Sequence, residues 1–189
     1  HPSSELNAVD GLLHEELTRL FGALREETEA RAVLLTGSKR AFCAGGDFAW
    51  FPELHGGLAK LDPLRHDAKQ LIWELLDVEL PIVAALNGTV AGGGAVIAAA
   101  CDIRIAAPRA KIAFLFTKVG LSGADMGASW LLPRIVGLGR AAELLMTGDF
   151  LDAESAERIG LYSRVVPQDR IVDEARTWAV RLAAGPSFA

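Results

Sequence analysis

The sequence predicts an α/β fold in which a largely parallel sheet carries flanking helices. Short apolar runs typical of buried strands alternate with longer segments whose leucines recur at helical spacing. Strands that are separated by helices are usually joined in parallel. Composition agrees, because 51% of the 189 residues are hydrophobic, which is enough apolar material for one sizeable core. We therefore expect a single domain over residues 1–189.

The first elements follow from helix periodicity and from residues that begin helices. A helix is expected after Asp10, a residue suited to the N-cap position, with leucines 13, 17, 20 and 24 on one face. His14 lies beside two glutamates on that helix and is expected to be solvated. Asp62-Pro63 is expected to open a second helix that runs to about residue 78. The segment 48–60 between them is expected to be irregular.

The remaining elements are short and alternate along the chain. Strands are expected at 32–36, 82–86, 103–106 and 112–114. Helices are expected at 95–100, 127–132, 140–146, 152–159 and 169–184. The small residues of the helix at 95–100 allow it to pack deeply in the core.

Two glycine-rich elements, Phe42–Asp47 and Ala91–Gly94, lie far apart in the sequence, and an apolar run precedes each of them. Glycine lets a ligand approach the backbone closely and leaves N–H groups able to point at it. Two such donors, brought together by the fold, can grip one carbonyl oxygen and stabilise the negative charge that develops there. The alternative is that both elements are only tight turns at strand ends.

Composition excludes several other classes of function. The net charge of −5 offers no basic surface for nucleic acid. The apolar stretch from Ile82 to Cys101 is interrupted by polar residues and glycines, so no membrane span is expected. Cys43 and Cys101 are too few for a disulfide framework, and we expect reduced thiols in a cytoplasmic protein. No cluster has metal-ligand spacing, so no metal site is expected.

A longer pattern connects these elements. It comprises Ala41–Asp47, Pro81–Gly94 and Ala100–Ala106, and continues through Leu132–Gly137 and Leu145–Gly148. The pattern resembles the enoyl-CoA hydratase/isomerase family, also called crotonases, in the same order over nearly the whole chain. The resemblance implies a crotonase-like spiral of strand-strand-helix turns. It also implies that residues 1–189 form one crotonase-like domain that lacks the family's first strands and C-terminal helices.

The resemblance implies roles for four residues of the glycine-rich elements. The two oxyanion donors would be the backbone N–H groups of Gly46 and Gly93. Gly93 precedes a helix, where unsatisfied N–H groups and the positive end of the helix dipole coincide. Ala44 would offer a backbone contact to the adenine part of coenzyme A. Asp47 would close the turn, because aspartate readily bonds nearby backbone N–H groups.

The sequence departs from the family at the two positions where hydratases carry glutamates. These positions are Val96 and Phe116 here. Water addition needs one group to activate the water and another to deliver a proton, and neither side chain can do this. The two-glutamate hydratase mechanism is therefore not supported, and Phe116 is expected to contact the substrate instead.

One carboxylate remains in this neighbourhood, that of Asp125 in the segment Gly120–Arg134. The segment resembles the isomerase branch that acts in phenylacetate breakdown, which uses an aspartate just before the corresponding helix. This chain has one extra residue between Gly120 and Asp125, so the carboxylate could be displaced. Asp125 is therefore either a catalytic acid/base or the N-cap of the helix expected near Gly127.

The resemblance implies an acyl-CoA enzyme that stabilises a thioester enolate and isomerises, or atypically hydrates, an enoyl-CoA. The alternative is a non-catalytic acyl-CoA-binding protein that has lost the hydratase carboxylates. Coenzyme A would be part of the substrate, and no separate cofactor is expected. The family also implies a homotrimer or a dimer of trimers, with neither nucleic acid nor membrane as a partner.

Overall fold

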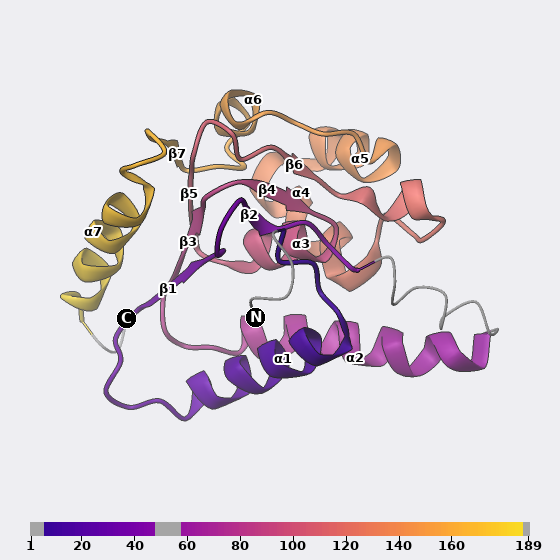
Figure 1. Cartoon of the computed structure of the whole chain (residues 1–189), viewed down its shortest axis with the longest axis horizontal. Helices are drawn as coiled ribbons and strands as arrows, with labels where there is room; N and C mark the ends of the chain where they lie inside the picture. The colour runs from indigo at the N-terminus through magenta and orange to yellow at the C-terminus, as the bar shows by residue number, and fades with distance from the viewer. Residues whose placement is uncertain (1–5, 48–57, 187–189) are drawn as a thin grey trace.

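The computed structural model describes residues 6–47 and 58–186, and its elements repeat a strand-strand-helix unit (Figure 1). The first unit consists of β1 (Val33–Thr36), β2 (Ala41–Cys43) and α2 (Leu58–Leu76), preceded by α1 (Gly11–Arg25). The second consists of β3 (Ile82–Leu86), β4 (Thr89–Ala91) and α3 (Gly93–Ala100). The third begins with β5 (Ile103–Ala106) and β6 (Ile112–Ala113).

Helices dominate the rest of the described chain. The helical turns η2 (Leu115–Val119) and η3 (Asp125–Gly127) lead into α4 (Ala128–Val136) and α5 (Leu138–Thr147). They are followed by α6 (Ala153–Arg158), the short strand β7 (Arg164–Val165) and α7 (Ile171–Ala183). Each of these α-helices was predicted from the sequence to within a few residues at either end.

Successive units stack so that equivalent strands pair. One sheet has the order β1-β3-β5-β7 and the other has the order β2-β4-β6. Every pairing between these strands is parallel, as predicted. The sequence did not predict β2 and β4 as separate strands, because each has only three residues. The two glycine-rich elements begin within these two short strands and continue beyond their carboxyl ends.

Alternate residues of β3 divide the interior into two cores. Ile82, Ala84 and Leu86 pack in the larger core with α3 and α4, whereas Val83 and Ala85 face a smaller core beneath α7. A strand that is buried on both faces must be apolar at every position, and all five residues of β3 are buried. Figure 1 shows α7 alongside this sheet at the left of the view, with α1 and α2 side by side along the bottom.

Helix α3 is fixed in place at its C-terminal end by Arg104 of β5. The Arg104 guanidinium donates to the Leu161 carbonyl at 2.7 Å and to the carbonyl of Cys101, the residue that ends α3. It also reaches the Ala98 and Ala99 carbonyls at 3.4 Å each. Burial lowers the pKa of Arg104, but these carbonyl contacts stabilise its charge. They also satisfy acceptors that a helix end leaves without an intrahelical donor.

The N-terminal helices confirm one prediction and correct two. Asp10 caps α1 as predicted, because its carboxylate accepts from the Leu13 N–H at 2.8 Å. His14 is buried rather than solvated, since it lies two turns from buried Phe21 on the same face. Asp62-Pro63 does not open the second helix, which begins one turn earlier, at Leu58. Of the segment expected to be irregular, 58–60 is therefore helical, and 48–57 lies outside the described residues.

Candidate active site

The parallel pairing of β2 with β4 brings the two glycine-rich elements side by side. Cys43 on β2 lies opposite Val90 on β4. Gly46 lies three residues after Cys43, and Gly93 lies three residues after Val90. The two glycines therefore lie at equivalent positions beyond the carboxyl ends of the two strands. The carboxyl edge of a parallel sheet is where ligands commonly bind in α/β proteins.

Contacts between the elements explain why their glycines lack side chains. Gly45 has φ +94°, and a Cβ atom there would lie 3.1 Å from the Ala91 carbonyl oxygen. Gly92 has φ +52°, a conformation that residues with a side chain seldom adopt. A Cβ on Gly94 would overlap the Cys43 side chain, at 2.6 Å from its Cβ. The backbones therefore pack directly against one another, which only glycine allows.

The N–H groups of Gly46 and Gly93 differ from those of Asp47 and Gly92, one adjacent residue in each element. Asp47 donates to the Val9 carbonyl at 2.9 Å, and Gly92 donates to the Ala113 carbonyl at 2.9 Å. Within residues 6–47 and 58–186, neither Gly46 nor Gly93 donates to a backbone carbonyl. Gly93 is the first residue of α3, where an N–H has no intrahelical acceptor. Both glycines are half-buried, whereas Gly45, Gly92 and Gly94 beside them are buried.

Ala44 and Asp47 hold the first glycine-rich element through their backbones. Ala44 donates its N–H to the Leu6 carbonyl at 3.0 Å, while Val9 donates to the Gly45 carbonyl at 2.8 Å. With the Asp47 N–H on Val9, these bonds attach the element to the chain that precedes α1. A ligand contact from the Ala44 backbone would therefore have to use its carbonyl oxygen.

Asp125 lies in η3, which packs against both α2 and α3. Its carboxylate accepts from the Met126 N–H at 2.9 Å, and its side chain is half-buried. The N-cap interpretation is wrong, because α4 begins only at Ala128 and Gly127 stands at the capping position without a side-chain bond. Two residues with positive φ, Met126 and Gly127, separate Asp125 from the helix.

Met126 is the residue that sequence reasoning missed. A Cβ on Gly93 would lie 3.1 Å from the Met126 Sδ and 3.5 Å from its Cε, so the thioether rests against Gly93. Through Met126, the Asp125 segment is in contact with the start of α3. The sequence signal was faint: Asp-Met-Gly resembles a turn, but it does not indicate where the methionine points.

Three other residues considered from the sequence, of which Phe116 was a predicted substrate contact, are apolar or inert. Val96 on α3 and Phe116 on η2 are both buried and offer no proton-transferring group. The Cys43 thiol is buried as well, and burial raises its pKa, so it is not an activated nucleophile. In the ranges 6–47 and 58–186 no three His, Cys, Asp or Glu side chains are grouped to hold a metal ion. No helix in these ranges has the length and apolarity needed to cross a membrane.

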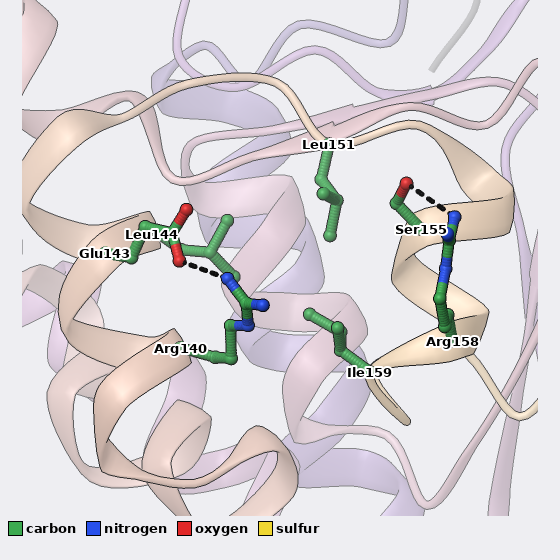
Figure 2. Close-up of a pocket in the computed structure, with 7 residues that line it drawn as sticks. All are labelled: Arg140, Glu143, Leu144, Leu151, Ser155, Arg158 and Ile159. Carbon is green, nitrogen blue, oxygen red and sulfur yellow. Dashed lines mark hydrogen bonds and ion pairs between the residues drawn. The ribbon is translucent and has the colours of Figure 1, made fainter.

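A hollow of about 240 Å³ lies between α5 and α6, and none of its lining residues belongs to the glycine-rich elements. Figure 2 shows Arg140 bonded to Glu143 and Arg158 bonded to Ser155 at its rim. The Arg140–Glu143 pair is exposed and measures 2.6 Å between Nη1 and Oε2. Because each guanidinium already bonds within its own helix, we do not assign a ligand to this hollow.

These features define a class of α/β protein that presents two backbone N–H donors from glycine-rich elements at the edge of a parallel sheet. Residues 2–189 match the sequence pattern of the family described as "Enoyl-CoA hydratase/isomerase". The chain belongs to the enoyl-CoA hydratase/isomerase family.

The relatives of this chain include proteins named as hydratases and a protein named as an isomerase. A "Probable enoyl-CoA hydratase" of Rhodobacter capsulatus is 39% identical over 184 residues, which are 97% of this chain and 70% of that protein. The 1,2-epoxyphenylacetyl-CoA isomerase of Escherichia coli is 34% identical, with the same two coverages of 97% and 70%. The crystal structure of an enoyl-CoA hydratase from Bacillus anthracis has a TM-score of 0.89 at 31% identity, covering 97% of this chain and 70% of that one. The chain spans about two thirds of the length of such relatives.

Proposed function

We propose that this chain binds an acyl-CoA thioester and stabilises its enolate between the N–H groups of Gly46 and Gly93. The observation that carries the proposal is the state of these two groups. They lie at equivalent positions after two neighbouring parallel strands and belong to half-buried residues. They donate to no backbone carbonyl of the described residues. Preorganised donors of this kind favour a developing oxyanion over the neutral carbonyl. The positive end of the α3 dipole adds to the effect at Gly93.

Asp125 is the proposed acid/base. Its half-buried carboxylate belongs to the turn that contacts Gly93, whereas the side chains of Val96 and Phe116 cannot transfer protons. Isomerisation needs only one carboxylate, which removes a proton next to the thioester and returns it elsewhere. Hydration needs a second group to activate water. The proposed chemistry is therefore movement of a double bond in preference to addition of water.

The remaining predicted residues have supporting roles in this proposal. The Ala44 carbonyl would contact the adenine of coenzyme A, and Asp47 would hold the turn through its bond to Val9. Phe116 would form part of the apolar surface beside the acyl group. Coenzyme A is part of the substrate, and the proposed reaction uses no other cofactor.

A panel of enoyl-CoA esters tests the proposal. The full-length protein should move double bonds in these esters faster than it adds water, as measured by chromatography of the acyl-CoA products. Binding without turnover would instead identify the alternative, a non-catalytic acyl-CoA-binding protein, and the buried Val96 and Phe116 are the observation that favours it. Failure to bind any acyl-CoA would contradict both functions.

Assembly as a homotrimer or a dimer of trimers, in the cytoplasm, stays a prediction from the family resemblance. Sedimentation of the full-length protein should give a trimer or a multiple of it. A monomer at micromolar concentration would contradict this prediction.

A further inference from the structure

Met126 combines two features that nothing in the proposed acid/base role requires. Its backbone has φ +51°, a conformation that L residues other than glycine, asparagine and aspartate seldom adopt. Its thioether lies against Gly93, with Sδ 3.1 Å from the position that a Cβ would occupy there. A bulky residue in a strained conformation at a candidate site indicates that its side chain is wanted where it points.

Met126 contacts both the Asp125 carboxylate and the core of the molecule. Its N–H donates to the Asp125 carboxylate at 2.9 Å, and Gly127 follows with φ +81°. The side chain is half-buried and packs against the main core of the molecule. The sulfur therefore rests on the first residue of α3, while the side chain also packs against the core.

We infer that Met126 is a specificity-determining residue, whose thioether restricts substituents on the acyl carbon next to the thioester carbonyl. The inference rests on the proposed function, in which Gly93 holds the carbonyl oxygen and Asp125 transfers the proton. Met126 contacts both groups, because its N–H donates to the Asp125 carboxylate and its thioether rests on Gly93. In this arrangement it borders the carbon atoms that react. A methyl branch at carbon 2 would compete with the thioether for this space, whereas a straight chain would pass.

The chemistry of methionine sets the size of the effect. One added methyl group in an apolar pocket typically changes selectivity by about 10- to 200-fold. A thioether is flexible and yields more readily than a branched or aromatic side chain. We therefore expect discrimination near the lower limit, about tenfold, between straight and 2-methyl-branched substrates.

Two substitutions of Met126 separate the thioether from the backbone strain. Met126→Ala removes the thioether and keeps a Cβ at positive φ, whereas Met126→Gly removes the thioether and relieves the strain. Both should raise kcat/KM for 2-methylbut-3-enoyl-CoA about tenfold relative to but-3-enoyl-CoA, since each ester carries a removable proton on carbon 2. Met146→Ala is the matched control, because Met146 on α5 is 76% exposed. An unchanged ratio in both Met126 variants would overturn the inference and leave the proposed function intact.

A readout that does not depend on turnover distinguishes failure of the inference from failure of the function. The sequence contains two methionines, so protein labelled with methyl-¹³C methionine should give one signal for Met126 and one for Met146. Titration with butyryl-CoA should shift the Met126 methyl signal and leave that of Met146 in place, even if the protein has no turnover. Binding measured by calorimetry without a shift of the Met126 signal would overturn the inference alone. Absence of binding would overturn both the inference and the proposed function.

Discussion

The two ends of helix α3 differ in how their backbone groups are satisfied. At the C-terminal end, buried Arg104 contacts the carbonyls of Ala98, Ala99 and Cys101. At the N-terminal end, the Gly93 N–H donates to no backbone carbonyl in 6–47 or 58–186 and remains half-buried. Both ends of any helix leave groups without intrahelical partners. Here the chain supplies partners at one end and leaves the other accessible to a ligand.

Under the proposed function, this difference separates stability from catalysis along a helix of eight residues. An unsatisfied buried carbonyl costs free energy of folding, so the C-terminal end is saturated by the chain itself. An unsatisfied N–H that a ligand can reach costs less, because water can bond to it until a carbonyl oxygen arrives. Substitutions at the N-terminal end should therefore change catalysis, and those at the C-terminal end should change stability.

The largest effect on turnover is expected from a substitution of Asp125, whose segment contacts the N-terminal end of α3. Asp125→Asn should reduce isomerase turnover about 10²- to 10⁴-fold, the usual contribution of a general base. The asparagine oxygen can still accept from the Met126 N–H, so folding and acyl-CoA affinity should stay close to those of the wild type. Steady-state kinetics and calorimetric binding measure the two quantities. Unchanged turnover in the folded variant would remove Asp125 from the mechanism.

The next largest effect is expected from Gly93→Pro, which removes one donor at a helix position where proline is tolerated. Turnover should fall about 10²- to 10³-fold, the cost of losing one oxyanion donor. Gly93→Ala is the matched control, because it keeps the N–H and adds a Cβ 3.1 Å from the flexible Met126 sulfur. The proline variant should therefore be much less active than the alanine variant. Equal activities would show that the Gly93 N–H does not contribute to catalysis.

At the C-terminal end of α3, Arg104→Met should lower the free energy of unfolding by about 3 kcal/mol, since it leaves several buried carbonyls without a donor. Chemical denaturation measures the change. Arg19→Met, at a side chain that is 76% exposed, should have little effect. If Arg104→Met were no more destabilising than Arg19→Met, the C-terminal end would not be held as described.

A smaller effect is expected from the thiol of Cys101, the C-cap of α3, whose pKa burial raises to about 12 from 9.0. A raised folded-state pKa favours folding fully below pH 9, and this contribution is lost as the pH rises from 9 to 12. By pH 10 about 1 kcal/mol of this contribution has been lost. Cys101→Ala should therefore flatten the decline of stability above pH 9 in denaturation curves. An equally steep decline in the variant would exclude this thiol as its cause.

The sequence predicted the parallel α/β fold and most helices because their periodicity and capping residues act locally, as at Asp10. It did not predict the burial of His14, which depends on how α1 packs against α2. At the site, two glycine-rich elements were recognisable because close backbone contact requires glycine, as at Gly94 beside Cys43. The position of the Met126 side chain could not be predicted, because a turn with two consecutive positive φ angles sets its direction.

The vibrational frequency of a bound thioester carbonyl tests the central claim most directly, because it reports polarisation of the group that Gly46 and Gly93 would hold. The measurement is an isotope-edited infrared difference spectrum of ¹³C=O-labelled butyryl-CoA bound to the full-length protein. We predict a carbonyl band at lower frequency than in water, and a band that moves back toward its position in water in Gly93→Pro. A bound carbonyl with the same frequency as in water would contradict the proposed oxyanion hole.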